Sequence, residues 1–123
     1  MILVDTSIWI DYLLRGDAIL AQLLDEDRVL GHPAVIGELA LGALRQRALI
    51  LRMLRRLPQT IRASADEVLT LIETASLTGS GIGYVDAHLL AAARLTDRAK
   101  LWTRDRRLRQ AAERLGVAAS LHH

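Results

Sequence analysis

Four acidic residues, Asp5, Glu38, Asp86 and Asp105, occupy positions where a carboxylate could do chemistry. Asp5 directly follows a short apolar run at residues 2–4, and Asp105 comes two residues after another run that ends in Thr103. Glu38 and Asp86 lie early in helical patterns, each among apolar neighbours. In an open α/β sheet, the ligand crevice lies outside the carboxyl ends of the strands. We therefore expect the four acids to meet in one such crevice.

Clustered carboxylates repel one another, which raises their pKa values unless a cation compensates the charge. The chain has no cysteine and no histidine pair at ligand spacing, so an all-oxygen site would favour Mg²⁺ or Mn²⁺ over Zn²⁺. Carboxylates around one or two such ions, about 3.5–4 Å apart if two, are an arrangement that hydrolyses phosphodiesters. The acids therefore predict a metal-assisted phosphate site.

Each acid also has a simpler explanation. Asp86 and Asp105 could cap their helices, and Glu38 could lie on a solvated helix face. These explanations fit Asp5 least, because burying a charge at the end of an apolar strand is unfavourable unless something cationic meets it.

Strand and helix patterns alternate along the chain and predict the elements that position these acids. Strands are expected at residues 2–4, 28–31, 60–62, 100–103 and 117–121. Helices are expected at residues 6–13, 18–25, 33–44, 44–57, 64–78, 85–95 and 106–115. The pattern predicts an α/β fold, a three-layer α/β/α sandwich whose central, mostly parallel sheet has four or five short strands. Residues 1–121 would form a single domain, and residues 122–123 would be a tag remnant or a disordered tail.

The composition is that of one globular domain of 123 residues, of which 51% are hydrophobic and 24% charged. No secretory signal or membrane-length apolar run stands out, so we expect a cytoplasmic protein with no membrane contact. Charge is unevenly distributed, because residues 39–62 hold six arginines and no acid, whereas residues 1–38 hold seven acids and two arginines. Such segregation indicates a polyanionic partner, although a high arginine share can also reflect genomic composition.

Four motifs in this order resemble the PIN-domain family, and within it the VapC-type toxins of toxin–antitoxin pairs. They are Leu3-Val4-Asp5-Thr6-Ser7-Ile8-Trp9-Ile10, Ile36-Gly37-Glu38-Leu39, Asp86-Ala87-His88-Leu89-Leu90-Ala91-Ala92-Ala93 and Leu101-Trp102-Thr103-Arg104-Asp105-Arg106-Arg107-Leu108. The resemblance covers nearly the whole chain and implies an endoribonuclease that depends on Mg²⁺ or Mn²⁺.

The resemblance also assigns roles to individual residues. It implies that Asp5, Glu38, Asp86 and Asp105 form the catalytic, metal-binding quartet, with Asp5 and Asp86 as direct ligands. The small hydroxyl residues Thr6, Ser7 and Thr103 would support the quartet or its waters. The partners implied are an RNA substrate, a VapB-type antitoxin whose C-terminal segment covers the catalytic groove, and a second copy of the chain in a homodimer.

Arginines are the expected RNA contacts, because aromatic residues for base stacking are scarce. Arg104, Arg106 and Arg107 flank Asp105 and are the first candidates for phosphate binding. The arginines within residues 45–62 could bind phosphates or an acidic antitoxin segment, or could form a solvated helix face.

Two other classes of protein remain open at this point. One is a non-catalytic PIN-like module that binds RNA or protein without cutting. The other is a receiver domain phosphorylated on aspartate, which is disfavoured because the chain's one lysine, Lys100, begins a predicted strand.

Overall fold

The sheet is small, parallel and central to the fold. The structure is a computed structural model that describes residues 1–121. Within them the strands pair in the order β2-β1-β3, with Ile2 opposite both Val29 and Lys100. The central strand β1 is fully buried, which explains why it reads as a continuous apolar run. The strands are β1 (Ile2–Val4), β2 (Val29–Leu30) and β3 (Lys100–Trp102).

The α/β class is confirmed, but the expected strand count of four or five is too high, because the sheet in residues 1–121 has three strands. The two expected outer strands are each reduced to one parallel bridge, Gly31 with Gln59 and Leu101 with Ala118. Pro58 has no N–H to extend the first pairing. The second segment continues into Ala119 and Ser120, small residues with little preference for a strand.

All seven expected helices are present in the described residues, and their ends differ from the prediction by a few residues. The third helix ends at Leu41 rather than near residue 44, and the fifth ends at Thr74 rather than near residue 78. Gly42 and Ala75 follow these ends as C-caps. The helices are α1 (Thr6–Arg15), α2 (Ala18–Asp25), α3 (Pro33–Leu41), α4 (Arg47–Arg56), α5 (Ala65–Thr74), α6 (Tyr84–Leu95) and α7 (Arg106–Arg114).

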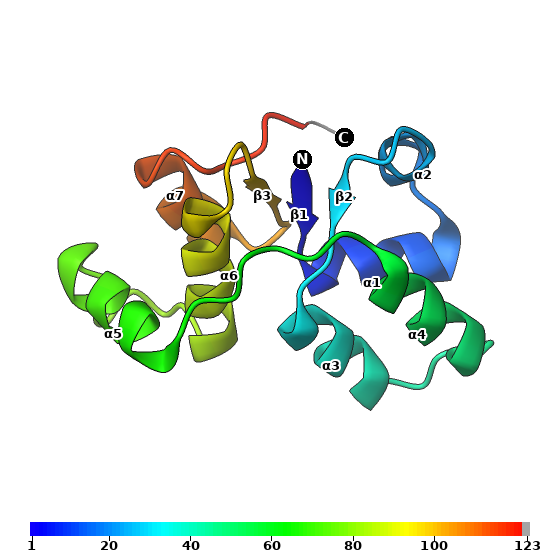
Figure 1. The fold of residues 1–123 in the computed structure, drawn as a ribbon, viewed down its shortest axis with the longest axis horizontal. Helices are drawn as coiled ribbons and strands as arrows, with labels where there is room; N and C mark the ends of the chain where they lie inside the picture. Colours follow the sequence, from blue (N-terminus) through cyan, green and yellow to red (C-terminus); the bar gives the residue numbers. More distant parts are fainter. Residues whose placement is uncertain (122–123) are drawn as a thin grey trace.

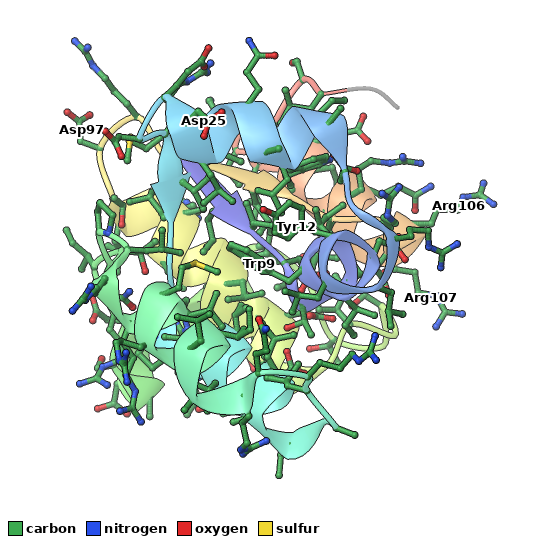
Figure 2. The ribbon with its side chains drawn as sticks, turned by 90° about the vertical axis from the view of Figure 1, so that its right-hand side faces the viewer. Trp9, Tyr12, Asp25, Asp97, Arg106 and Arg107 are labelled. Atoms are coloured by element: carbon green, nitrogen blue, oxygen red, sulfur yellow. The ribbon has the colours of Figure 1, made fainter. Side chains whose placement is uncertain are left out.

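The helices form two groups with the sheet between them. Figure 1 shows α5, α6 and α7 on the side of β3, and α1, α2, α3 and α4 on the side of β2. Trp9 of α1 is 1% exposed and meets Tyr12 edge to face, with ring centroids 5.9 Å apart. Both rings lie between α2 and α4 (Figure 2). Trp9 is therefore a core residue. No helix in residues 1–121 is long and apolar enough to cross a membrane.

The parallel strands end at one edge of the sheet, and helices begin there. α1 follows β1 after one residue, α3 follows β2 after two, and α7 follows β3 after three. α6 also begins at this edge and runs back along the sheet, in contact with β3 (Figure 1). The edge therefore gathers the first turns of several helices, each of which carries one of the four acids or lies close to one.

Candidate active site

Asp5 is the buried centre of this edge. Its side chain is the N-cap of α1, and the residue is 6% exposed. Its backbone N–H donates to the Trp102 carbonyl oxygen at 3.0 Å, so the sheet itself fixes its position. Its Oδ1 accepts a hydrogen bond from the Thr6 backbone N–H at 2.8 Å, and its Oδ2 accepts one from the Ser7 hydroxyl at 2.9 Å.

Thr103 joins Asp5 to the segment that carries Asp105. Its buried hydroxyl donates to Asp5 Oδ2 at 2.6 Å and accepts the Asp105 backbone N–H at 3.0 Å. Asp105 Oδ1 in turn accepts the Leu108 N–H at 2.9 Å as the N-cap of α7. One hydroxyl therefore ties together two of the four acids, which lie 100 positions apart in sequence.

Glu38 reaches the same cluster from α3. Its Oε1 accepts the Thr6 hydroxyl at 2.7 Å, and Thr6 is the first residue of α1, directly after Asp5. The three hydroxyl residues predicted to support the quartet therefore all contact one of the acids.

Asp86, in the first turn of α6, completes the group. Its pKa is raised from 3.8 to about 6, first by burial and then by repulsion from Asp5, Asp105 and Glu38. A hydrogen bond with the Gly83 backbone offsets part of this rise. Because the other three carboxylates all act on Asp86, the four acids lie within electrostatic reach of one another and are not scattered over the surface.

No positive side chain neutralises this cluster. In the part of the chain that the structure describes, none of the four carboxylates forms an ion pair with an arginine or a lysine. Within the same residues, no group of three or more His, Asp or Glu side chains is arranged so that it could hold a metal ion. The acids instead accept the hydrogen bonds described above. Carboxylate oxygens are the ligands that hard divalent cations prefer, and the four side chains would have to move closer together to hold such an ion.

Arg104, predicted from sequence to bind RNA, is engaged within the protein. Its guanidinium forms ion pairs with Asp11 of α1, through Nε, and with Asp17, the N-cap of α2, at 3.3 Å. Its backbone N–H donates to the Ser7 hydroxyl at 3.2 Å. Arg104 therefore fastens the loop between Thr103 and Asp105 to two helices on the other side of β1.

The other two predicted RNA contacts are more open. Arg106 and Arg107 project from the edge of the molecule in Figure 2, and neither forms an ion pair within the described residues. Arg107 also packs over the loop before α6, where a Cβ added at Gly81 would lie 2.5 Å from its guanidinium nitrogen. Gly81 has a φ of +84°, a backbone conformation that favours glycine.

His32 is a buried residue that caps the helix of Glu38, and it was not singled out from the sequence. It is 2% exposed, and its Nδ1 accepts the Ala34 N–H at 3.0 Å as the N-cap of α3, the helix of Glu38. Burial lowers the pKa of His32 to about 4, with further contributions from His88 and Arg62, so the imidazole is neutral at pH 7. The following Pro33 at the first helical position was the signal in the sequence.

Comparisons with known proteins give the class that this geometry indicates. The PIN domain family model matches residues 2–114, and the chain belongs to this family. Ribonuclease VapC32 of Mycobacterium tuberculosis is 49% identical over 118 residues, which cover 96% of this chain and 95% of the relative.

Two solved structures share the fold. FitAcB from Neisseria gonorrhoeae has a TM-score of 0.63 at 24% identity, covering 96% of this chain and 95% of that one. FitAB bound to an IR36 DNA fragment has a TM-score of 0.63 at 20% identity, covering the whole of both chains. The chain is therefore a PIN-domain relative of the VapC ribonucleases.

The raised pKa of Asp86 predicts that this residue destabilises the metal-free protein. The folded chain holds the Asp86 proton more tightly than the unfolded chain, so ionisation opposes folding. The penalty is absent below the ordinary pKa of 3.8, grows as pH rises, and is complete above about 6. At about pH 8, Asp86→Asn should raise the free energy of unfolding by about 1 kcal/mol, a value reduced because the side chain is partly exposed. Near pH 4 the substitution should leave the free energy of unfolding unchanged.

Urea unfolding in EDTA over a pH series measures this effect. Asp97→Asn, an exposed acid remote from the cluster (Figure 2), is the matched control and should show no such pH-dependent gain. An Asp86→Asn variant less stable than the wild type at high pH would contradict the assignment.

The ion pairs of Arg104 predict a second, separate effect. Arg104→Met keeps the length of the stem but removes both pairs, and should lower the free energy of unfolding by about 1–2 kcal/mol because Asp17 is nearly buried. Arg106→Met removes a nearby exposed charge that pairs with no carboxylate of residues 1–121, and should change the free energy of unfolding by less than about 0.5 kcal/mol. Equal stabilities of the two variants in denaturant titrations would show that Arg104 is not fastened in this way.

Proposed function

We propose that this protein is a divalent-metal-dependent endoribonuclease and the toxin component of a VapBC-type toxin–antitoxin pair. The observation that carries the proposal is the cluster of four carboxylates around Asp5, with no arginine or lysine paired to any of them in residues 1–121. A buried acid without a cationic partner is unfavourable for folding alone. A bound cation supplies the missing charge, and membership of the PIN family supports this function.

The residues divide the work as follows. Asp5 and Asp86 would hold Mg²⁺ or Mn²⁺ directly, with Glu38 and Asp105 as direct or water-mediated ligands. Such an ion, when bound, acidifies a water molecule and offsets the negative charge that develops on the phosphate. Thr103 and Ser7 orient Asp5 through its Oδ2, and Thr6 orients Glu38. These fixed hydrogen bonds leave the remaining oxygen lone pairs of the acids for the cation and its waters.

The repulsion felt by Asp86 also has a role in this proposal. Without a cation the cluster favours the protonated acid, whose pKa of about 6 lies near neutrality. A divalent ion would favour the ionised form, so metal affinity should fall as the pH drops through about 6. Metal binding and deprotonation of Asp86 are therefore coupled.

The catalytic proposal predicts that Asp5→Asn and Asp86→Asn abolish RNA cleavage while both variants remain folded, since each removes a ligand charge. Cleavage of total RNA in Mg²⁺ or Mn²⁺, and its arrest by EDTA with recovery on adding metal, provide the measurement. Asp25→Asn and Asp97→Asn change the same charge at exposed sites away from the cluster (Figure 2) and should cut like the wild type. Continued cutting by Asp5→Asn and Asp86→Asn would remove the mechanism.

The same experiment separates the enzyme from a non-catalytic module of the same fold. A binding module would retain RNA without cutting it at any metal concentration. Thermal stabilisation of the wild type by Mn²⁺, absent in Asp86→Asn, reports metal binding independently of cleavage.

The antitoxin partner has a candidate docking surface. A groove of about 380 Å³ runs from Glu38 between α1, α3 and the start of α4. Its walls include Ile10, which is 45% exposed, and Leu14, which is 74% exposed. This exposed apolar lining supports an amphipathic antitoxin segment that also covers the catalytic acids. A homodimer belongs to the same proposal.

The groove predicts a variant that escapes inhibition. Ile10→Lys with Leu14→Lys should weaken the complex with the small protein encoded by the neighbouring reading frame, because two apolar contacts are replaced by charges. RNA cleavage by the free enzyme should remain. Leu69→Lys, at a 54% exposed position on α5, is the control that should still be inhibited. Titration of cleavage with the antitoxin measures the difference, and equal inhibition of both variants would place the partner elsewhere.

A further inference from the structure

A positive surface lies on and around α4, outside the catalytic cluster. Residues 39–62 contain no acid, and all six of their cations are exposed arginines. Three of them follow one another on a single helical face at positions i, i+3 and i+4, namely Arg52, Arg55 and Arg56. We call these three residues the α4 basic face.

The charge of this face is not used inside the protein. The ion pairs of residues 1–121 engage Arg15, Arg28, Arg104 and Arg109, and none involves an arginine of α4. Asp27 borders the same surface near Arg52 and Arg56, but it forms no ion pair with either. The α4 basic face therefore presents to solvent three arginines that form no ion pair within residues 1–121.

The helix dipole accounts for only some of the cations of α4. Arg55 and Arg56 lie in the last turn, where the helix dipole favours positive charge. Arg47 lies in the first turn, where the dipole disfavours it, and no acid is present there. Gln46 caps this end without a side-chain hydrogen bond, in a left-handed conformation with φ of 52°. α4 is instead held by packing, above all of the buried Leu54.

The depression between the three arginines suits an anionic backbone. It has a volume of about 400 Å³ and is lined by Ala48, Leu51 and the three arginines. Its apolar contacts are one methyl group and one half-buried leucine, too few to anchor a peptide, whereas Leu49, Met53 and Leu57 line a separate depression that Arg52 and Arg56 also border. Arginine forks at i, i+3 and i+4, about 5–6 Å apart at Cβ, can instead each bind a phosphate bidentately.

α4 borders the groove of the catalytic acids on another side. That groove runs from Glu38 past Gly42 and Arg45 to Ile50, whereas the α4 basic face lines a separate depression of the same helix. In Figure 2, α4 lies at the front of the molecule, whereas Arg106 and Arg107 project from the right-hand edge. A strand of RNA that leaves the acids along this groove would reach α4 at Ile50 and would have to pass around the helix to meet the α4 basic face.

We propose that the α4 basic face binds the sugar–phosphate backbone of the RNA substrate at a distance from the cleaved bond. This proposal rests on the ribonuclease function proposed above and adds a second contact region to it. The arginines would recognise the charge and spacing of the phosphates and not the bases, because arginine–phosphate contacts carry no sequence information by themselves. It supplies affinity for long RNA, while the acids supply the chemistry.

The test compares two triple variants with the same loss of charge. Arg52→Gln/Arg55→Gln/Arg56→Gln removes the α4 basic face. Arg15→Gln/Arg28→Gln/Arg109→Gln removes three arginines that already pair with Asp11, Glu26 and Glu113. Binding of a fluorescent single-stranded RNA is measured in EDTA over a salt series, so that cleavage does not interfere. All six positions are exposed, and thermal melts verify folding.

The expected result is specific to the first variant. Its slope of log affinity against log salt should become shallower by about 2, since each phosphate contact on a single strand contributes about 0.7. The wild type should then lose roughly twentyfold more affinity than this variant between about 50 and about 200 mM salt. The control variant should keep the wild-type slope.

Equal slopes in the two triple variants would overturn the proposal, because net charge alone would then explain RNA binding. Unchanged RNA binding with loss of the antitoxin complex would overturn it as well and assign the face to a protein partner. A wild type that cuts no RNA but shows the slope difference would refute the catalytic function alone. A wild type that cuts RNA while the slopes agree would refute only the role of α4.

Discussion

The fold depends on one electrostatic constraint, the burial of the Asp5 carboxylate beside three other acids. Asp5 is fixed by the sheet, because its N–H pairs with Trp102, and its side chain therefore cannot leave the end of β1. Hydrogen bonds from Thr6, Ser7 and Thr103 stabilise its charge without neutralising it. The repulsion that remains appears at Asp86, the acid whose pKa is raised. The carboxylates therefore repel one another in the folded protein, and a bound cation would reduce this repulsion.

The parallel sheet makes this concentration of acids tolerable. Asp5 and Asp105 are both N-caps, of α1 and α7, and Asp86 lies in the first turn of α6. Each therefore faces the positive end of a helix dipole, which stabilises a carboxylate by about 0.3–1 kcal/mol at an exposed end. Capping and catalysis are therefore not competing explanations for these acids. The same hydrogen bonds that start the helices also hold the carboxylates where a cation could meet them.

The sequence predicted all seven helices of residues 1–121, because apolar periodicity and turn residues are local signals. It also predicted that the four acids gather in one place. It overestimated the sheet, since the segments near Gln59 and Ala118 each form one bridge, which depends on distant neighbours. It placed Arg104 among the RNA contacts, and the structure shows its guanidinium held by Asp11 and Asp17. His32 gave no pattern of its own as a helix cap. The two bridges are long-range contacts, and so are the ion pairs of Arg104 in space across the sheet, and spacing along the chain does not reveal them. The cap formed by His32 is a local contact with Ala34, made by a residue type that seldom caps a helix.

The distribution of arginines follows from the same constraint. An arginine paired with Asp5 or Asp86 would neutralise part of the negative charge of the cluster and would compete with a metal ion for the same carboxylate oxygens. The structure avoids this, since Arg104 lies one residue from Asp105 yet turns to Asp11 and Asp17 instead. An RNA-cleaving site of this kind repels its own polyanionic substrate whenever the cation is absent. Attraction must then come from cations outside the cluster, and the arginines of the α4 basic face, which form no ion pair within residues 1–121, can supply it.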